Sequence, residues 1–491
     1  MKKREYQWQF LLLIIVLTVF LFRFFSWNFV NLDLAFDEAQ YWTWSLDIDW
    51  GYYSKPPLLA WLIRISSSTC GISEMCLRIS SPILYSLSAF FISSTAYMLC
   101  ETNSKGRAAL LAGITWILIP GVSFSSGMIS TDVPMLFFSS IVIWSFCCLL
   151  FHKNEAYNSY YIAALTVSLA LGFLSKYAIL LLLFSLMVFF AVNSSSRNHF
   201  KNKLPPRKLI ISILLLFLLI FPHLWWNYNN GFITFQHTAA NINVAGVNYS
   251  FYNTFVFFLE QFAVFGPINF IILLYLVISY KILSNKEKML LILALVPIVM
   301  ILVQAFISRA HANWAAISFI PASILVALFL DKRWFLKEKR IYYFSIFLSL
   351  IVLIFLPFYA YNNPKLDPFK KMRGWEEVVL QISEIYSKYP GAVLVADDRK
   401  ILAESLYYMS IKPKKWVRWN ADGKIHDHYE LVTKHDDLKN EIGIMVSVES
   451  NNEHFFQSFS EVIYLGEVTR IIGERRIKKY KIWLLKGYNS S

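Results

Sequence analysis

Long runs of apolar residues recur through the first 360 positions of the chain, separated by short polar segments. An α-helix needs about 17–25 apolar residues to cross the hydrocarbon core of a bilayer, and most of these runs have that length. The pattern predicts a polytopic α-helical membrane protein with about 11 transmembrane helices. The predicted spans cover residues 9–30, 77–99, 108–125, 133–151, 158–174, 177–193, 208–225, 254–280, 289–307, 314–330 and 341–360.

The pattern changes near residue 361, where charged residues become frequent and no apolar run is long enough to span. The segments "GAVLVADD" and "IGIMVSVES" are typical of buried strands, and "RKILAESLYYMS" has apolar residues at helical spacing. The segments "EVIYLGEV" and "KKYKIWLLKGY" suggest a closing hairpin. We therefore expect two domains, a transmembrane domain over 1–360 and a small soluble α/β domain over 361–491.

Lysine and arginine mark one side of the membrane. They gather in alternate loops, among them Lys2, Lys3 and Arg4 at the N-terminus and the segment 194–208. Basic loops of membrane proteins face the cytoplasm, so we expect the N-terminus there. The first long loop, 31–76, then lies outside, and an odd number of spans places the C-terminal domain outside as well.

Composition agrees with a membrane protein and excludes other classes. Only 16% of the residues are charged and 57% are hydrophobic, whereas soluble domains carry about 25% charged residues. The net charge of +14 would suit a nucleic-acid-binding protein, but it resides in short loops and no such motif accompanies it. We predict no nucleic-acid partner, and a lipid bilayer as the surroundings.

The five cysteines do not form a metal-binding pattern. Cys100, Cys147 and Cys148 lie in or beside apolar spans, where they act as small apolar side chains. Cys70 and Cys76 lie in the predicted outer loop, where they either form a disulfide or remain buried thiols.

Ionisable residues gather on the predicted outer face, most of them close to the end of a span. Charges so near hydrocarbon are costly and are functional candidates. The structural alternative is that each one only reaches the interface or pairs locally. The set comprises Asp37, Glu38, Lys55, Asp132, Lys176, Arg309 and His311.

Carboxylates with isolated cations suit the transfer of a sugar from a polyprenyl phosphate. The leaving phosphate needs cations such as Lys55, Lys176 and Arg309, and it leaves without being protonated. The acceptor hydroxyl needs one base. Glycoside hydrolysis would instead need two carboxyl groups flanking the bond. The first loop also contains aromatic residues, among them Tyr41, Tyr52 and Tyr53. They could stack on a sugar, or they could only form the aromatic belt found at membrane interfaces.

Four motifs in the outer loops resemble those of the bacterial family-39 glycosyltransferases, relatives of the protein O-mannosyltransferases and of the lipid A aminoarabinose transferase. They are "DEAQYWTWS" with "DWGYYSKPPLLAWLI", "TDVPMLFF", "LGFLSKYAILL" and "HANWAAISF", in this order over about residues 30–330. The resemblance implies a GT-C fold, a polyprenyl-phosphate sugar donor and a site on the periplasmic face of the bacterial inner membrane.

The resemblance also implies roles for single residues. Asp37 matches the catalytic Asp of the first loop, which serves as the base of an inverting transfer. Glu38 completes the acidic pair, and Asp132 matches the acid of the second outer loop. Lys55 and Lys176 match lysines that contact the lipid phosphate.

Two positions depart from the aminoarabinose branch. Gln40 stands where that branch has an Arg, and Ser54 stands where it has a Glu that contacts a metal. We therefore expect neither a metal nor another cofactor. The sequence does not identify the sugar that is transferred.

The sequence thus predicts a glycosyltransferase that moves a sugar from a polyprenyl-phosphate donor to a lipid, glycan or protein acceptor, with Asp37, Glu38 and Asp132 as candidate catalytic residues. The alternative is a transporter or flippase of a lipid-linked sugar. Such proteins place their charges near the bilayer midplane, often in repeated halves, whereas here the charges lie at one face and no repeat is evident.

Overall fold

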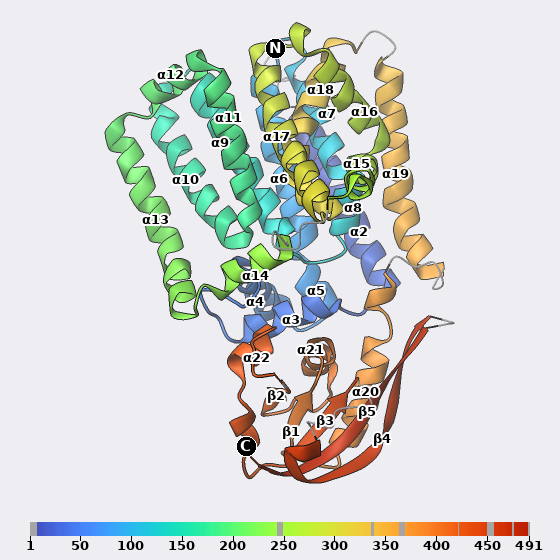
Figure 1. The fold of residues 1–491 in the computed structure, drawn as a ribbon. Helices are drawn as coiled ribbons and strands as arrows, with labels where there is room; N and C mark the ends of the chain where they lie inside the picture. Colours follow the sequence, from blue (N-terminus) through green and yellow to red (C-terminus); the bar gives the residue numbers. More distant parts are fainter. Residues whose placement is uncertain are drawn as a thin grey trace. The chain divides into compact units, whose positions relative to one another are not determined.

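Helices make up most of the chain up to residue 362, and the strands of the described part all follow residue 392 (Figure 1). The computed structural model describes residues 7–242, 249–334, 338–362, 369–420, 422–448, 456–473 and 476–489. The basic residues Lys2, Lys3 and Arg4 lie outside this part of the chain.

The chain divides into two compact units. The first, here called the helical unit, consists of Met1–Ser26, Lys55–Leu59 and Arg78–Leu356. The second, here called the α/β unit, consists of Trp27–Ser54, Ala60–Leu77 and Pro357–Ser491.

The helical unit contains most of the long apolar helices, which pack as neighbours in pairs such as α6 with α7 and α9 with α10 (Figure 1). Its principal helices are α2 (Gln7–Val30, which continues into the α/β unit), α6 (Ser80–Leu99), α7 (Lys105–Leu118), α8 (Pro120–Ser125), α9 (Asp132–Phe151), α10 (Asn158–Ser175), α11 (Leu180–Val192), α12 (Ser194–Lys203), α13 (Pro206–Asn229), α14 (Ile233–Ile242), α15 (Phe251–Phe265), α16 (Pro267–Ile278), α17 (Asn285–Ile307), α18 (Phe319–Lys332) and α19 (Glu338–Asn362).

Eight of the helical segments in the described residues are long and apolar enough to cross a membrane, or up to ten if each of two bent helix pairs is one span. The predicted membrane fold is confirmed, but the expected number of about 11 spans is higher than this. The predicted span 108–125 is two short helices, α7 and α8, which meet at Ile119 and Pro120. Proline has no backbone N–H and ends the preceding helix.

The predicted span 254–280 is also broken. Helices α15 and α16 meet at an angle of 116° at Gly266 and Pro267. Gly266 has φ 88°, a conformation that favours glycine, and Pro267 is the first residue of α16. The basic segment from residue 194, expected as a loop, forms helix α12, which is bent by 114° from the preceding helical segment Tyr177–Val192.

A buried arginine donates hydrogen bonds at the end of α7, where the predicted span 108–125 is broken. Arg23 of α2 is 1% exposed and donates hydrogen bonds to the carbonyl of Ile117 and to Ser123 Oγ. The last carbonyls of a helix have no partner within it, so the guanidinium replaces an N–H that the break before Pro120 removes.

The sheet of the α/β unit has the strand order β2-β1-β3-β5-β4. Its first three strands are parallel, and β5 lies antiparallel to both β3 and β4. The predicted strands, helix and hairpin of the C-terminal region are confirmed, whereas β2 and helix α20 were not foreseen. The elements are α20 (Trp375–Tyr386), β1 (Val393–Ala396), α21 (Arg399–Tyr408), β2 (Trp416–Arg418), α22 (His428–Val432), β3 (Gly443–Ser447), β4 (Phe459–Gly473) and β5 (Arg476–Tyr488).

Strands β1 and β3 form the centre of this unit, and every residue of both is buried. Helix α21 packs against β1, and α20 packs against α21 and β4 (Figure 1). One apolar cluster includes Val393, Val395, Met445 and Leu485. Coverage of both faces explains why these parallel strands are continuously apolar.

Most of the predicted first outer loop, apart from Lys55–Leu59, belongs to the same unit as the C-terminal region. It contains α3 (Phe36–Leu46), α4 (Leu58–Cys70) and α5 (Glu74–Arg78), and α3 packs against α21. Asp33 accepts a hydrogen bond from the backbone N–H of Trp375 at 2.7 Å, so its carboxylate lies at the N-terminus of α20. The predicted division of the chain at residue 360 stays a prediction.

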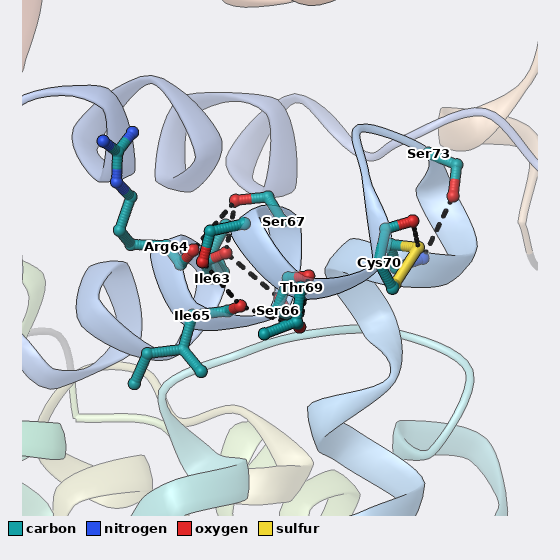
Figure 2. The surroundings of a disulfide bond; sticks show 10 residues. Ile63, Arg64, Ile65, Ser66, Ser67, Thr69, Cys70 and Ser73 are labelled. Carbon is teal, nitrogen blue, oxygen red and sulfur yellow. Dashed lines mark hydrogen bonds between the residues drawn. A yellow bond between two sulfur atoms is a disulfide. The ribbon is translucent and has the colours of Figure 1, made fainter.

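Cys70 and Cys76 form a disulfide that joins the end of α4 to α5 (Figure 2). The backbone N–H of Cys76 also bonds to Ser73 Oγ in the intervening turn at 3.3 Å. Of the two alternatives left open by the sequence, the structure has the disulfide. Cys100, Cys147 and Cys148 are buried free thiols.

Candidate functional site

The two adjacent acids of the "DEAQYW" motif have different environments. Both lie in the first turn of α3. Glu38 is 2% exposed, and its Oε2 accepts a hydrogen bond from the backbone N–H of Ala35 at 2.9 Å, which satisfies one of the unpaired donors at the start of the helix. The side chain of Asp37 is 50% exposed. Neighbouring helix positions point in different directions, so one acid stabilises the helix while the other reaches solvent.

A cation from the C-terminal region accompanies Asp37. Arg399, the first residue of α21, has its Nη2 3.9 Å from Asp37 Oδ1, and its Nη1 donates to Gln40 Oε1 at 3.2 Å. The guanidinium also lies over the ring of Phe36, 5.1 Å from its centroid. Arg399 is not recognisable from sequence because it is 359 residues from Gln40 along the chain and stands in no recognised motif.

The second predicted acid pairs with a predicted cation. Asp132 is the first residue of α9, and Lys176 directly follows α10, where the chain turns into the next helix. Lys176 Nζ donates to Asp132 Oδ1 at 2.7 Å, and both side chains are largely buried. The structure therefore brings together two residues that the sequence had selected from separate loops.

Asn313 completes this group. Its Nδ2 donates to Asp132 Oδ2 at 2.8 Å, so each carboxylate oxygen of Asp132 has a hydrogen bond. Asn313 lies in the short helix η4 (Ala312–Ser318), within the motif "HANWAAISF". The motif was recognised from sequence, but this amide was not selected because a neutral side chain is common near a membrane surface.

Arg309 and His311 come from the same loop and are exposed. Arg309 donates to the backbone carbonyl of Asn241, at the end of α14, at 3.2 Å. The ring of His311 lies edge-on to Trp314 with centroids 5.3 Å apart. Their predicted contact with substrate stays a prediction.

The tyrosines that were predicted to contact a sugar are mostly packed inside the α/β unit. Tyr52 stacks on Trp44 with centroids 4.7 Å apart and donates from its hydroxyl to the Trp44 carbonyl at 2.9 Å. Tyr41 is buried against the same indole. Tyr53 is half-buried, and burial raises the pKa of its hydroxyl. Contact of these tyrosines with a sugar stays a prediction.

Lys55 is half-buried and stands directly before Pro56, Pro57 and helix α4. Proline is tolerated at the start of a helix, where its missing N–H costs no hydrogen bond, so Pro56 and Pro57 suit the position directly before α4. The predicted role of Lys55 on the donor phosphate stays a prediction.

Two histidines outside the predicted set pack against other side chains. His428 lies against the rings of Trp44 and Tyr52, and burial lowers the pKa of its imidazole to about 3. His223 lies within α13, is fully buried and bonds to the hydroxyl of Tyr177 at 2.7 Å. Sequence alone does not show which histidines pack against other side chains.

In the part of the chain that the structure describes, no group of three or more His, Cys, Asp or Glu side chains is arranged to hold a metal ion. The expectation of a metal-free site stays a prediction.

Comparison with known proteins supports the resemblance read from the motifs. Residues 54–226 match a family described as dolichyl-phosphate-mannose-protein mannosyltransferase. The chain is 29% identical over 408 residues to the lipid A galacturonosyltransferase RgtD of Rhizobium johnstonii, a match that covers 80% of this chain and 82% of that protein.

Solved structures show the same fold. ArnT from Cupriavidus metallidurans, bound to undecaprenyl phosphate, matches with a TM-score of 0.67 at 14% identity over 98% of each chain. The same enzyme in its apo state matches with a TM-score of 0.64 at 13% identity over 97% of each chain.

These matches confirm the resemblance, the fold class and the enzyme class predicted from the sequence. The chain is a membrane glycosyltransferase with the GT-C fold.

Proposed function

We propose that the protein transfers one sugar from a polyprenyl-phosphate donor to lipid A or its core, on the outer face of the bacterial inner membrane. RgtD is named for lipid A and ArnT was solved with undecaprenyl phosphate, which supports this acceptor and this class of donor. The name of RgtD also makes galacturonic acid the first sugar to test.

The catalytic base in this proposal is Asp37. The observation that carries it is the difference in exposure among the three candidate acids, since Glu38 and Asp132 are buried and the side chain of Asp37 is 50% exposed. Glu38 caps its own helix, and Asp132 accepts from Lys176 and Asn313. Asp37 has a half-exposed carboxylate beside a cation, so it is the acid best placed to receive a proton from an incoming hydroxyl.

The reaction is a single displacement. Asp37 takes the proton of the acceptor hydroxyl, and the acceptor oxygen forms a bond to the anomeric carbon. The bond from that carbon to the phosphate oxygen breaks, and its electron pair stays on the phosphate. The polyprenyl phosphate leaves as an anion that Lys176 and Lys55 stabilise, and attack opposite the leaving group inverts the anomeric centre.

Two features support a site outside the cytoplasm. The Cys70–Cys76 disulfide lies in the first loop, and disulfides persist in oxidising compartments such as the periplasm. The basic segments lie in other loops, as the cytoplasmic side requires.

The test of the base is Asp37→Asn in the purified full-length enzyme, with a polyprenyl-phosphate sugar and lipid A. Removal of a general base lowers turnover by about 10²–10⁴-fold. Glu38→Gln is the matched control, because a glutamine at this helix position preserves the capping hydrogen bond, and it is expected to stay active. Full turnover of Asp37→Asn, or a product that keeps the anomeric configuration of the donor, would contradict the proposal.

The cation role is tested separately with Lys176→Ala. Loss of a charge-assisted contact costs about 1.5–3 kcal/mol, so kcat/KM for the donor is expected to fall about tenfold to a hundredfold. Lys176→Arg keeps the charge beside Asp132, and it is measured in place of the alanine variant if that variant folds poorly. Lys281, an exposed lysine of a basic loop, is the control position, where alanine is expected to have no effect. Unchanged donor use by both Lys176 variants would show that the ion pair is only structural.

A further inference from the structure

The first residues of α21 lie at a topological switch point of the sheet. From β1 the chain runs through α21 to β2 on one side, and it later returns to β3 on the other side of β1. In open α/β sheets, ligand-binding residues cluster at the carboxyl ends of strands at such a point. Arg399 stands three residues after the end of β1.

The turn that carries Arg399 is held by hydrogen bonds on both sides. Asp397 accepts from Ser447 Oγ and from the backbone N–H of Val448 at 3.0 Å, which ties the end of β1 to the end of β3. Asp398 caps α21, since its Oδ1 accepts from the backbone N–H of Lys400 at 2.6 Å. Arg399 therefore projects from a fixed backbone.

The side chain of Arg399 is directed to the first turns of α3. Gln40, which is 1% exposed, accepts from one guanidinium nitrogen, and the ring of Phe36 lies beneath the guanidinium plane. A second guanidinium nitrogen faces the carboxylate of Asp37 at 3.9 Å. Gln40 and Phe36 thus contact the guanidinium of Arg399, and a nitrogen of the same guanidinium faces the half-exposed carboxylate of Asp37.

We propose that Arg399 is a positioning residue for the catalytic base, supplied by the C-terminal region of the chain. This inference rests on the proposed function of Asp37. A guanidinium at this distance attracts the carboxylate, which favours the orientations in which Asp37 faces Arg399. The C-terminal region then contributes to the transfer step and not only to the stability of the unit.

The competing explanation is that Arg399 only fastens α21 to α3. The two explanations differ in what they change. A fastening residue affects the amount of folded protein and its thermal stability. A positioning residue affects kcat of the folded enzyme while KM for the donor stays unchanged, and its effect depends on the presence of Asp37.

The experiment measures kcat, KM for the donor and the melting temperature of full-length Arg399→Ala, Arg399→Lys and Gln40→Ala. We expect kcat of Arg399→Ala to fall about tenfold to a hundredfold, the range for a lost charge-assisted contact, and Arg399→Lys to recover part of it. Lys400→Ala is the matched control, because Lys400 lies over the same Phe36 ring at 5.3 Å but on the next position of the helix. It is expected to keep wild-type kcat.

A double-mutant cycle gives the decisive comparison. If Arg399 acts through Asp37, adding Arg399→Ala to Asp37→Asn lowers the residual turnover no further. Independent, multiplying effects would overturn the inference, as would equal losses in Arg399→Ala and Lys400→Ala. If the alanine variant does not fold, wild-type kcat in both Arg399→Lys and Gln40→Ala also overturns it. An inactive Asp37→Asn with a fully active Arg399→Ala contradicts this inference alone, whereas an active Asp37→Asn contradicts the proposed function.

Discussion

At the scale of the residue, burial and hydrogen bonding decide which polar groups are available for chemistry. Glu38 and Asp37 are adjacent and chemically alike, yet Glu38 is buried and caps the helix, whereas the side chain of Asp37 is 50% exposed. The same distinction separates His426, which is exposed and pairs with Asp422, from His428, whose Nδ1 is buried and has no hydrogen-bond partner in the described residues.

His428 gives the α/β unit a predictable response to acid. Its pKa is lowered from 6.5 to about 3 by burial, so the unfolded chain takes up a proton near pH 6.5 and the folded chain does not until about pH 3. Stability is therefore lost as the pH falls from 6.5 towards 3, by on the order of 1–2 kcal/mol at pH 5. His428→Phe removes this contribution.

The measurement is hydrogen exchange of peptides that cover β2 and α22, at pH values of about 7 and 5 after correction for intrinsic exchange. Protection is expected to fall more in the wild type than in His428→Phe. His426→Phe is the control at an exposed position two residues away. An equal loss of protection in all three proteins would contradict the prediction.

Residues that carry a charge near hydrocarbon were recognisable from sequence, and their partners were not. Asp132 and Lys176 stood out because charges are rare at the ends of apolar spans. Asn313 and Arg399 are ordinary in their local sequence, and they are defined by contacts that only the folded chain makes. Tyr41 and Tyr52 were selected from the sequence, but both are buried. An aromatic cluster in a loop does not reveal which of its rings are buried.

At the scale of the element, local periodicity was sufficient for most of the helices and strands. The strands β1 and β3, helix α21 and the β4–β5 hairpin each have a pattern that can be read within a short window. The strand order, which places β1 between β2 and β3, depends on pairing between distant segments. Helix breaks such as Gly266–Pro267 lie within continuous apolar runs, so the hydropathy pattern does not reveal them.

The disulfide between α4 and α5 predicts the reactivity of the five cysteines. Alkylation of the denatured protein without a reductant is expected to modify the three free thiols and to leave Cys70 and Cys76 unmodified. Alkylation after reduction is expected to modify all five. Mass spectrometry of the peptides distinguishes the two states.

Protein made in cells that lack periplasmic thiol oxidation is the control, in which Cys70 and Cys76 are expected to be alkylated without reduction. Alkylation of both residues in protein from ordinary cells would contradict the disulfide and remove one of the two observations that support an outer location for this loop.

At the scale of the whole molecule, orientation in the membrane determines whether the proposed chemistry is reasonable. The eight to ten candidate spans in the described residues include both even and odd numbers, so the count does not determine on which side of the membrane the C-terminal region lies. The alternation of basic and non-basic loops is independent of that count, since it compares charges on successive loops. We therefore base the orientation on charge and on the disulfide.

The last prediction concerns this orientation. A reporter that is active only in the periplasm, fused after Tyr408 at the end of α21, is expected to be active, and the same reporter fused after Lys281 is expected to be silent. A reporter that works only in the cytoplasm should give the opposite pattern at both positions. The physical reason is that translocation of the basic segments around Lys281 is unfavourable, whereas the loops that carry Asp37, Asp132 and Lys176 are poor in lysine and arginine. A cytoplasmic signal after Tyr408 would place Asp37 and Arg399 away from a periplasmic acceptor, and the proposed transfer to lipid A on the outer face would then be untenable even if the enzyme were active in detergent.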